Sequence, residues 1–145
     1  MKPICAFSVG LLLAVAAISP ASAQETIAMD QPAHVGKVDT VCTGIGDDAQ
    51  HDPRWLAYPV RIEFSNGAAQ YVSGAHVELF SGAGEPLAAF DCAGPWVLFK
   101  LAPGKYHVNA KLTGQQGGGT ASAMFSPPSH GQKRVVLRFG TQANL

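Results

Sequence analysis

The sequence has little charge of either sign, few cysteines and no pattern typical of a long helix. Its 10 Lys and Arg balance 10 Asp and Glu, so the formal net charge is +0, and nothing in it attracts nucleic acid. No basic amphipathic helix is visible, which argues against a membrane-surface protein. The G-x-S-x-G elbow and the phosphate-binding glycine loops are also absent. These absences argue against the hydrolase and nucleotide-binding classes.

The first residues have the features of a secretory signal. Lys2 precedes an apolar run over residues 4–18, and Ala21 and Ala23 supply the small residues that signal peptidase needs. The run is shorter than the roughly 20 residues of a membrane-spanning helix, and no later run is long and apolar enough. We therefore predict a signal peptide over residues 1–23, cleavage after Ala23, a periplasmic or secreted product, and no membrane span after cleavage. An uncleaved anchor is the alternative.

Cysteine is scarce, and its distribution predicts one disulfide. Cys5 falls in the predicted signal peptide, which leaves Cys42 and Cys92 in a chain bound for an oxidising compartment. A metal site would need more thiolates or nearby histidines, and a redox pair would be closer in sequence. A structural bridge is the favoured interpretation.

Most of the remaining chain reads as short strands. Apolar residues alternate with polar ones over residues 60–64, 75–80 and 106–112, and glycine- or proline-containing turns separate the runs. Seven to nine such runs without a three-turn helix predict an all-β sandwich. A parallel sheet with helical crossovers is excluded because no connection has the length of such a helix.

Two segments lack this pattern. Residues 24–37 show no clear period, so we predict a flexible leader before a single domain at residues 38–145. Residues 44–53 are dense in turn-forming residues and predict a loop. Asp52 and Pro53 suit the cap and first position of a short helical turn over residues 52–57.

Two motifs carry a family resemblance. Residues 72–80 read V-S-G-A-H-V-E-L-F, and residues 101–110 read L-A-P-G-K-Y-H-V-N-A. In this order and spacing they resemble the carboxypeptidase regulatory-like domains, relatives of the transthyretin-like and Cna B-type sandwiches, over roughly residues 60–112. Residues 42–96 also resemble small exported proteobacterial proteins that carry this domain. The resemblance implies an immunoglobulin-like or prealbumin-like Greek-key sandwich of about seven strands, used as a binding or packing module without a reaction.

The chain departs from the catalytic members of these groups. It leaves no room for a carboxypeptidase catalytic domain, and it ends in residues 140–145, G-T-Q-A-N-L, without the Tyr-Arg-Gly-Ser tail expected of a transthyretin-like hydrolase. No lysine lies in residues 60–64, where a Cna B-type isopeptide crosslink would begin. The resemblance therefore supports a module without enzymatic activity.

One loop is a candidate metal site. Asp47, Asp48, His51 and Asp52 could offer oxygen donors and an imidazole to Ca²⁺ or another divalent ion. The spacing matches no known ligand loop, and such residues also stabilise turns by bonding their own backbone. A solvated loop is the simpler interpretation.

The outward faces of two strands form a candidate binding surface. It comprises His76, Glu78, Phe80, His107 and Asn109. His76 and His107 would come within reach of each other if their strands pair. Among the other aromatic residues, Phe90 has the parity of an outward position, and Trp96 is expected to pack over the disulfide.

Together these patterns predict an exported, non-enzymatic β-sandwich with a binding or structural role in the periplasm or cell envelope. We expect no cofactor, and the expected partner is an envelope protein or a glycan. The alternative is a carrier of a small ligand or divalent metal that uses residues 47–52. A small hydrolase is less favoured because its motifs are missing.

Overall fold

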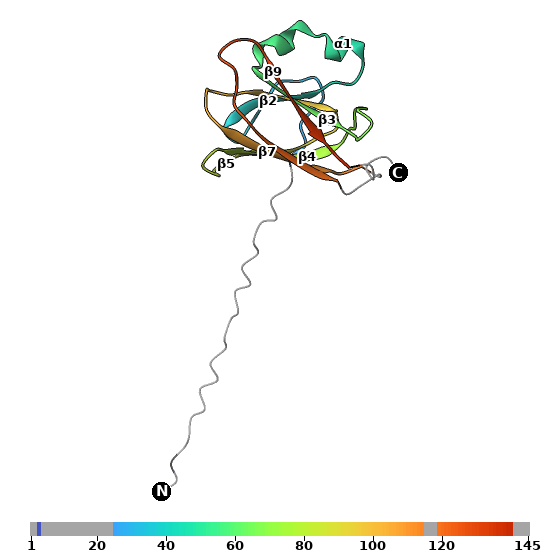
Figure 1. Cartoon of the computed structure of the whole chain (residues 1–145). Helices are drawn as coiled ribbons and strands as arrows, with labels where there is room; N and C mark the ends of the chain where they lie inside the picture. The colour runs from blue at the N-terminus through green and yellow to red at the C-terminus, as the bar shows by residue number, and fades with distance from the viewer. Residues whose placement is uncertain (1–2, 4–24, 115–118, 141–145) are drawn as a thin grey trace.

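The protein is a two-layer sandwich of β-sheets, as predicted. The computed structural model describes residue 3, residues 25–114 and residues 119–140. Within these residues, nine strands form a five-stranded and a four-stranded sheet, which pack face to face in Figure 1. The sequence patterns indicated seven to nine strands and the family resemblance about seven, and the all-β class is confirmed.

The five-stranded sheet has the order β1-β2-β6-β3-β9. Its strands are β1 (Ala33–Val35), β2 (Val38–Thr43), β6 (Trp96–Lys100), β3 (Val60–Ser65) and β9 (Lys133–Arg138). Neighbours are antiparallel except for β3 and β9, which run parallel with Val60 opposite Lys133.

The four-stranded sheet has the order β5-β4-β7-β8 and is antiparallel throughout. Its strands are β5 (Pro86–Cys92), β4 (Ala75–Ser81), β7 (Tyr106–Leu112) and β8 (Thr120–Phe125). Beyond β3 the chain passes repeatedly between layers: β4 and β5 lie in this sheet, β6 in the other, β7 and β8 here again, and β9 in the other.

Alternating residues of the two sheets fill the space between them. Ile62 and Phe64 from β3 lie in one core cluster with Val77 and Leu79 from β4. Phe90 of β5 is 0% exposed and meets Phe99 of the facing sheet edge to face, with ring centroids 6.1 Å apart. Phe90 therefore points inward, and its predicted outward position was wrong.

Two short helices cover part of the outer side of the five-stranded sheet. The helices α1 (Asp47–Gln50) and η1 (Pro53–Ala57) lie in the connection from β2 to β3, and α1 is visible above the sheet in Figure 1. Trp55 and Tyr58 pack there on Val41 and Leu98. Because β6 is covered on both sides, its apolar residues run consecutively instead of alternating.

The helical turn after the loop is confirmed. Asp52 precedes η1, and its side chain accepts a hydrogen bond of 2.9 Å from the backbone N–H of Arg54. Pro53 occupies a first-turn position, where its missing N–H costs nothing. The turn thereby holds Trp55 against the sheet.

The leader belongs to the sandwich, which corrects the prediction of a flexible segment before residue 38. Ile27 is buried, and its N–H donates to the carbonyl of Asp91 on β5. Asp30 N–H donates to the carbonyl of Cys42 on β2, and β1 then pairs with β2. Residues 25–35 thus contact both sheets. The sequence of this segment shows no regular hydrophobic period because its residues contact first the four-stranded sheet and then the five-stranded one.

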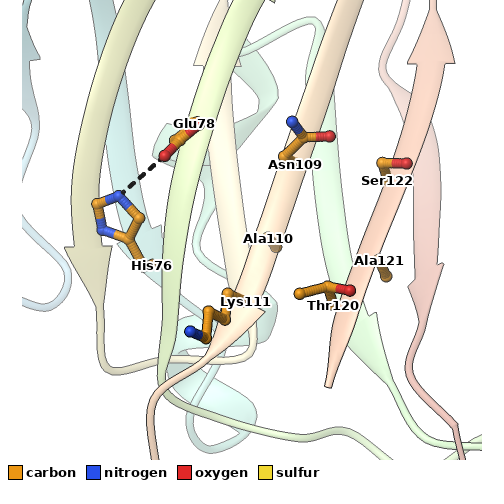
Figure 2. A pocket seen from close by; sticks show the side chains of 8 residues that line it. All are labelled: His76, Glu78, Asn109, Ala110, Lys111, Thr120, Ala121 and Ser122. Atoms are coloured by element: carbon orange, nitrogen blue, oxygen red, sulfur yellow. Dashed lines mark ion pairs between the residues drawn. The ribbon is translucent and has the colours of Figure 1, made fainter. Parts of the chain in front are cut away.

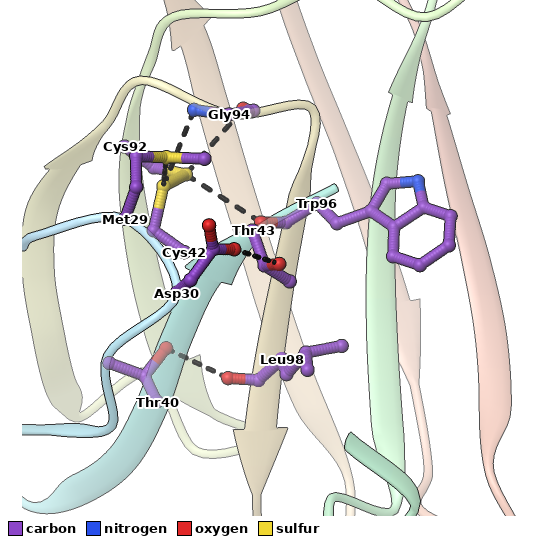
Figure 3. Close-up of a disulfide and its surroundings, with 9 residues drawn as sticks. All are labelled: Met29, Asp30, Thr40, Cys42, Thr43, Cys92, Gly94, Trp96 and Leu98. Atoms are coloured by element: carbon purple, nitrogen blue, oxygen red, sulfur yellow. Dashed lines mark hydrogen bonds between the residues drawn. A yellow bond between two sulfur atoms is a disulfide. The ribbon is translucent and has the colours of Figure 1, made fainter. Parts of the chain in front are cut away.

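The predicted disulfide between Cys42 and Cys92 is present, with Cα atoms 5.5 Å apart. It joins β2 of one sheet to β5 of the other, and both residues are buried. Figure 3 shows Met29 and Gly94 beside it: Sδ of Met29 lies 3.3 Å from Sγ of Cys42, and the N–H of Gly94 lies 3.3 Å from the same sulfur.

Trp96 does not pack over the disulfide as predicted. Its ring points away from the two sulfurs in Figure 3. It meets Tyr71 edge to face at 5.9 Å, and the Arg61 guanidinium lies 4.4 Å from its centroid. The reason is strand parity: Val97 takes the inward position next to Trp96 and joins the main core.

The predicted signal peptide, residues 1–23, lies outside the described residues apart from residue 3. Across the part of the chain that is described, no helix has the length and apolarity to cross a membrane.

Candidate functional site

The outer face of the four-stranded sheet carries a hollow of about 510 Å³. We call it the outer hollow. It is lined by His76, Glu78, Asn109, Ala110, Lys111, Thr120, Ala121 and Ser122. Figure 2 shows these side chains on three neighbouring strands, with the polar ones standing along the sheet. The volume is within the range of small-molecule sites.

Strand pairing arranges the outward side chains in rows across the sheet. In the first row His76 of β4 lies opposite Lys111 of β7, which lies opposite Thr120 of β8. A second row contains Glu78, Asn109 and Ser122 in the same way. Because alternate residues of a strand point to the same face, these six side chains share the solvent side.

A third row is apolar and aromatic. It consists of Phe80, His107 and Met124. The rings of Phe80 and His107 have centroids 6.1 Å apart at an angle of 32°, and Met124 is 68% exposed. This row lines a second hollow of about 310 Å³, which shares Asn109 with the outer hollow. The face therefore changes from polar to aromatic along the strands.

His76 is held by carboxylates at one end of the outer hollow. Its Nδ1 donates to Oδ1 of Asp91 over 2.6 Å, and its Nε2 lies 3.5 Å from Oε1 of Glu78, the pair drawn in Figure 2. Asp91 stands directly opposite His76 on β5. Since a carboxylate only accepts, Nδ1 carries a proton. The ring is thus oriented by its neighbours.

The five predicted binding residues all lie on this face, although not in the predicted contact. His76 and His107 are not cross-strand neighbours, because the register places Lys111 opposite His76 and Phe80 opposite His107. Sequence reasoning did not include Lys111, Thr120, Ser122 and Met124. Lys111 continues the alternation of His107 and Asn109, so its parity could have identified it.

The geometry does not resemble a catalytic triad. A hydrolytic histidine needs a nucleophile within hydrogen-bond reach of its free ring nitrogen. Here Nε2 of His76 faces Glu78, and the hydroxyls of Thr120 and Ser122 are on β8, beyond β7. The residues suit binding through hydrogen bonds more than proton transfer to a hydroxyl.

The candidate metal ligands have local partners. Nδ1 of His51 lies 2.9 Å from the carbonyl of Asp47, and Asp52 binds the side chain of Arg54. Asp47 and Asp48 lie in the first turn of α1. In the ranges that the structure describes, no three His, Cys, Asp or Glu residues are grouped to hold a metal ion. The structure therefore does not assemble these four as a ligand set.

A buried carboxylate lies on the outer side of the other sheet. Glu63 is 0% exposed, its Oε2 accepts from Nε of Arg134 at 2.5 Å, and its Oε1 lies 3.0 Å from Nε of Arg61. The hydrogen bond to Glu63 raises the pKa of Arg134 above its ordinary value. Arg61 is stacked on Trp96. The two guanidinium groups offset the charge of the buried carboxylate, while Oε1 of Glu63 and Nε of Arg61 have no hydrogen-bond partner among the described residues.

Comparison with models of protein families and with curated proteins gave no match for this chain.

Proposed function

We propose that this protein is an exported, non-enzymatic binding module of the periplasm or cell envelope, and that its ligand occupies the outer hollow. The observation that carries the proposal is the gathering of six polar side chains from three strands around one hollow of about 510 Å³. Such hollows with a few convergent polar groups are the usual form of small-molecule sites.

The rigidity of the surrounding sheet supports a binding role. The hollow is built on the central strands β4 and β7, and β4 is tied by β5 to the disulfide at Cys92. Because the backbone under these side chains is paired, it does not have to be ordered when a ligand binds, which favours affinity. The proposal also keeps the resemblance to carboxypeptidase regulatory-like domains, whose members serve as modules.

Export is supported by the disulfide and by the signal-like pattern over residues 1–23. Disulfides persist in oxidising compartments. Expression from the full sequence in a bacterial host, followed by sequencing of the protein from the periplasmic or medium fraction, should give Gln24 as the first residue. Recovery of an uncleaved chain from the membrane fraction would contradict export as a free protein.

The binding proposal is tested by mapping. Small molecules and glycans released from the envelope of the source organism are added to the isotope-labelled chain with its disulfide formed. We expect amide shifts concentrated around His76, Asn109 and Ser122. Ser122→Trp should block the hollow and abolish these shifts, whereas Ser129→Trp, in an exposed loop position, should leave them. Shifts that persist in Ser122→Trp would show that the ligand does not bind in the outer hollow.

A further inference from the structure

We propose that the ligand of the outer hollow is a neutral oligosaccharide, bound along the three cross-strand rows with one sugar ring seated against Phe80 and His107. This inference rests on the proposed function, because it names the ligand of the same site. Three properties of the face carry it: mixed hydrogen-bonding groups, charges of both signs, and an aromatic surface continuous with the polar one.

The polar rows match hydroxyl groups. A sugar hydroxyl both donates and accepts, so its binding site needs both kinds of partner. Glu78 accepts, Lys111 donates, and Asn109 does both. The hydroxyls of Thr120 and Ser122 add two adaptable groups on β8. A hollow that bound a purely donating or purely accepting ligand would not need this mixture.

The charges of the face favour a ligand without net charge. Lys111 is the lysine of the hollow, and Glu78 faces it from the next row. His76 is bound on either side by Asp91 and Glu78. Lys111 and the two carboxylates place both signs on this face, so an acidic glycan or a polycation would meet repulsion as well as attraction. A ligand that carries only hydroxyl groups meets no such charge repulsion.

The third row provides the surface for one face of a sugar ring. A pyranose carries C–H groups on its ring faces, and these pack on aromatic rings as other apolar groups do. Phe80 and His107 lie side by side at the shared edge of the two hollows, where Asn109 belongs to both. A ring on the aromatic row can therefore be continuous with further rings over the polar rows.

The position on a sheet face argues against a peptide. An extended peptide is usually recognised by adding a strand to a sheet edge, where unpaired backbone N–H and C=O groups are available. On β4 and β7 those groups are used by the neighbouring strands on both sides. Over β4 and β7 the face therefore offers side chains only, which suits a ligand whose polar groups are hydroxyls. β8 is an edge strand of this sheet, and a peptide probe tests whether a peptide pairs with it.

The test uses the full chain with its disulfide formed and soluble probes of defined chemistry. Maltohexaose, cellohexaose and chitotetraose represent neutral oligosaccharides, a heparin oligosaccharide represents acidic glycans, and a hexapeptide of Ser, Thr and Ala represents extended peptides. Amide shifts locate binding, and titration gives the dissociation constant. We expect at least one neutral probe to shift amides of β4, β7 and β8, with no comparable effect of the heparin or peptide probes.

Two variants identify the contacts. Phe80→Ala and Asn109→Ala should each weaken the bound neutral probe about 2- to 10-fold, the usual effect of losing one aromatic contact or one hydrogen bond. Leu56→Ala is the matched control, because Leu56 is 76% exposed on η1 away from this face. It should leave the affinity unchanged, and equal weakening by all three variants would overturn the proposal.

The outcomes separate the ligand class from the site. If the envelope fraction shifts the outer hollow but no neutral probe does, or only heparin or the peptide binds there, the oligosaccharide is overturned and the binding module remains. If neither the fraction nor any probe shifts it, both proposals fail. Shifts by a neutral probe that are lost in Ser122→Trp and weakened in Phe80→Ala support both.

Discussion

The carboxylate of Glu63 and the guanidinium of Arg134 are hydrogen-bonded over 2.5 Å between β3 and β9, two strands that pair in parallel. Glu63 is fully buried although it lies on the outer side of its sheet. The pair therefore fixes the C-terminal strand to the sheet by a charged contact, in addition to the backbone ladder.

The first prediction concerns this contact. Arg134→Ala leaves the buried carboxylate of Glu63 with Arg61 as its remaining cation, so the free energy of unfolding should fall by about 1–3 kcal/mol. The measurement is urea unfolding followed by fluorescence. Arg138→Ala, an exposed position of the same strand, is the control and should change stability by no more than about 0.5 kcal/mol. Equal losses in both variants would contradict the role of Glu63.

The second prediction concerns the disulfide. Cys42 and Cys92 are 50 residues apart, and closing a loop of this length stabilises the fold by on the order of 4 kcal/mol in the chain-entropy model. Reduction should therefore shift urea unfolding to lower concentration. The double variant Cys42→Ala and Cys92→Ala should resemble the reduced protein and respond to no reductant. Two alkylatable thiols in the unreduced native chain would rule the bridge out.

The third prediction concerns the leader. Ile27 is 5% exposed within the main core, so Ile27→Ala should lower the free energy of unfolding by about 2–5 kcal/mol. Thr26→Ala, at the exposed neighbouring position, serves as the control. The Ile27 amide, which donates to Asp91, should also exchange slowly with solvent. Rapid exchange together with a negligible effect of Ile27→Ala would mean that the segment is not part of the fold.

The fourth prediction concerns pH. The side chain and the backbone N–H of Arg54 both donate hydrogen bonds to the carboxylate of Asp52. These bonds, the side-chain one having the larger effect, hold the pKa of Asp52 below its ordinary value of 3.8. A folded-state pKa below the unfolded one stabilises the fold above pH 3.8, and this contribution is lost as the pH falls through the folded-state pKa. An NMR titration of the Asp52 carboxyl should show a midpoint below 3.8.

Arg54→Ala should return that midpoint upward toward the ordinary value, because it removes the side-chain donor. Arg138→Ala, on β9, should not move it. A midpoint that is unchanged by Arg54→Ala would show that the contact is not formed in solution.

Local patterns predicted the strands and one binding face. Alternation placed His76, Glu78 and Phe80 on one side of β4, since a strand has a period of two. The same reasoning failed for Phe90, although the answer was available: Cys92 must point inward to reach Cys42, and Phe90 shares its parity.

Long-range pairing could not be predicted from these patterns. The neighbours of β7 determine that Asn109 lies between Glu78 and Ser122, and β8 is separated from β4 by many residues. Likewise the burial of Glu63 depends on Arg134, which β9 brings from far along the chain. The candidate site was therefore predicted in part: its residues on β4 and two on β7 were identified, whereas Lys111 and the residues of β8 were not.

The parallel pairing of β3 with β9 also determines when the sandwich can be completed. Val60 pairs with Lys133, which follows it by more than seventy residues, so this pairing cannot form until β9 is available. Until the last strand has emerged, one edge of β3 offers unpaired backbone groups to any other extended chain. Pairings between distant segments form slowly. Under the proposed export the chain would cross a membrane unfolded, and the interval between the arrival of these two strands would be the period in which a chaperone protects it from aggregation.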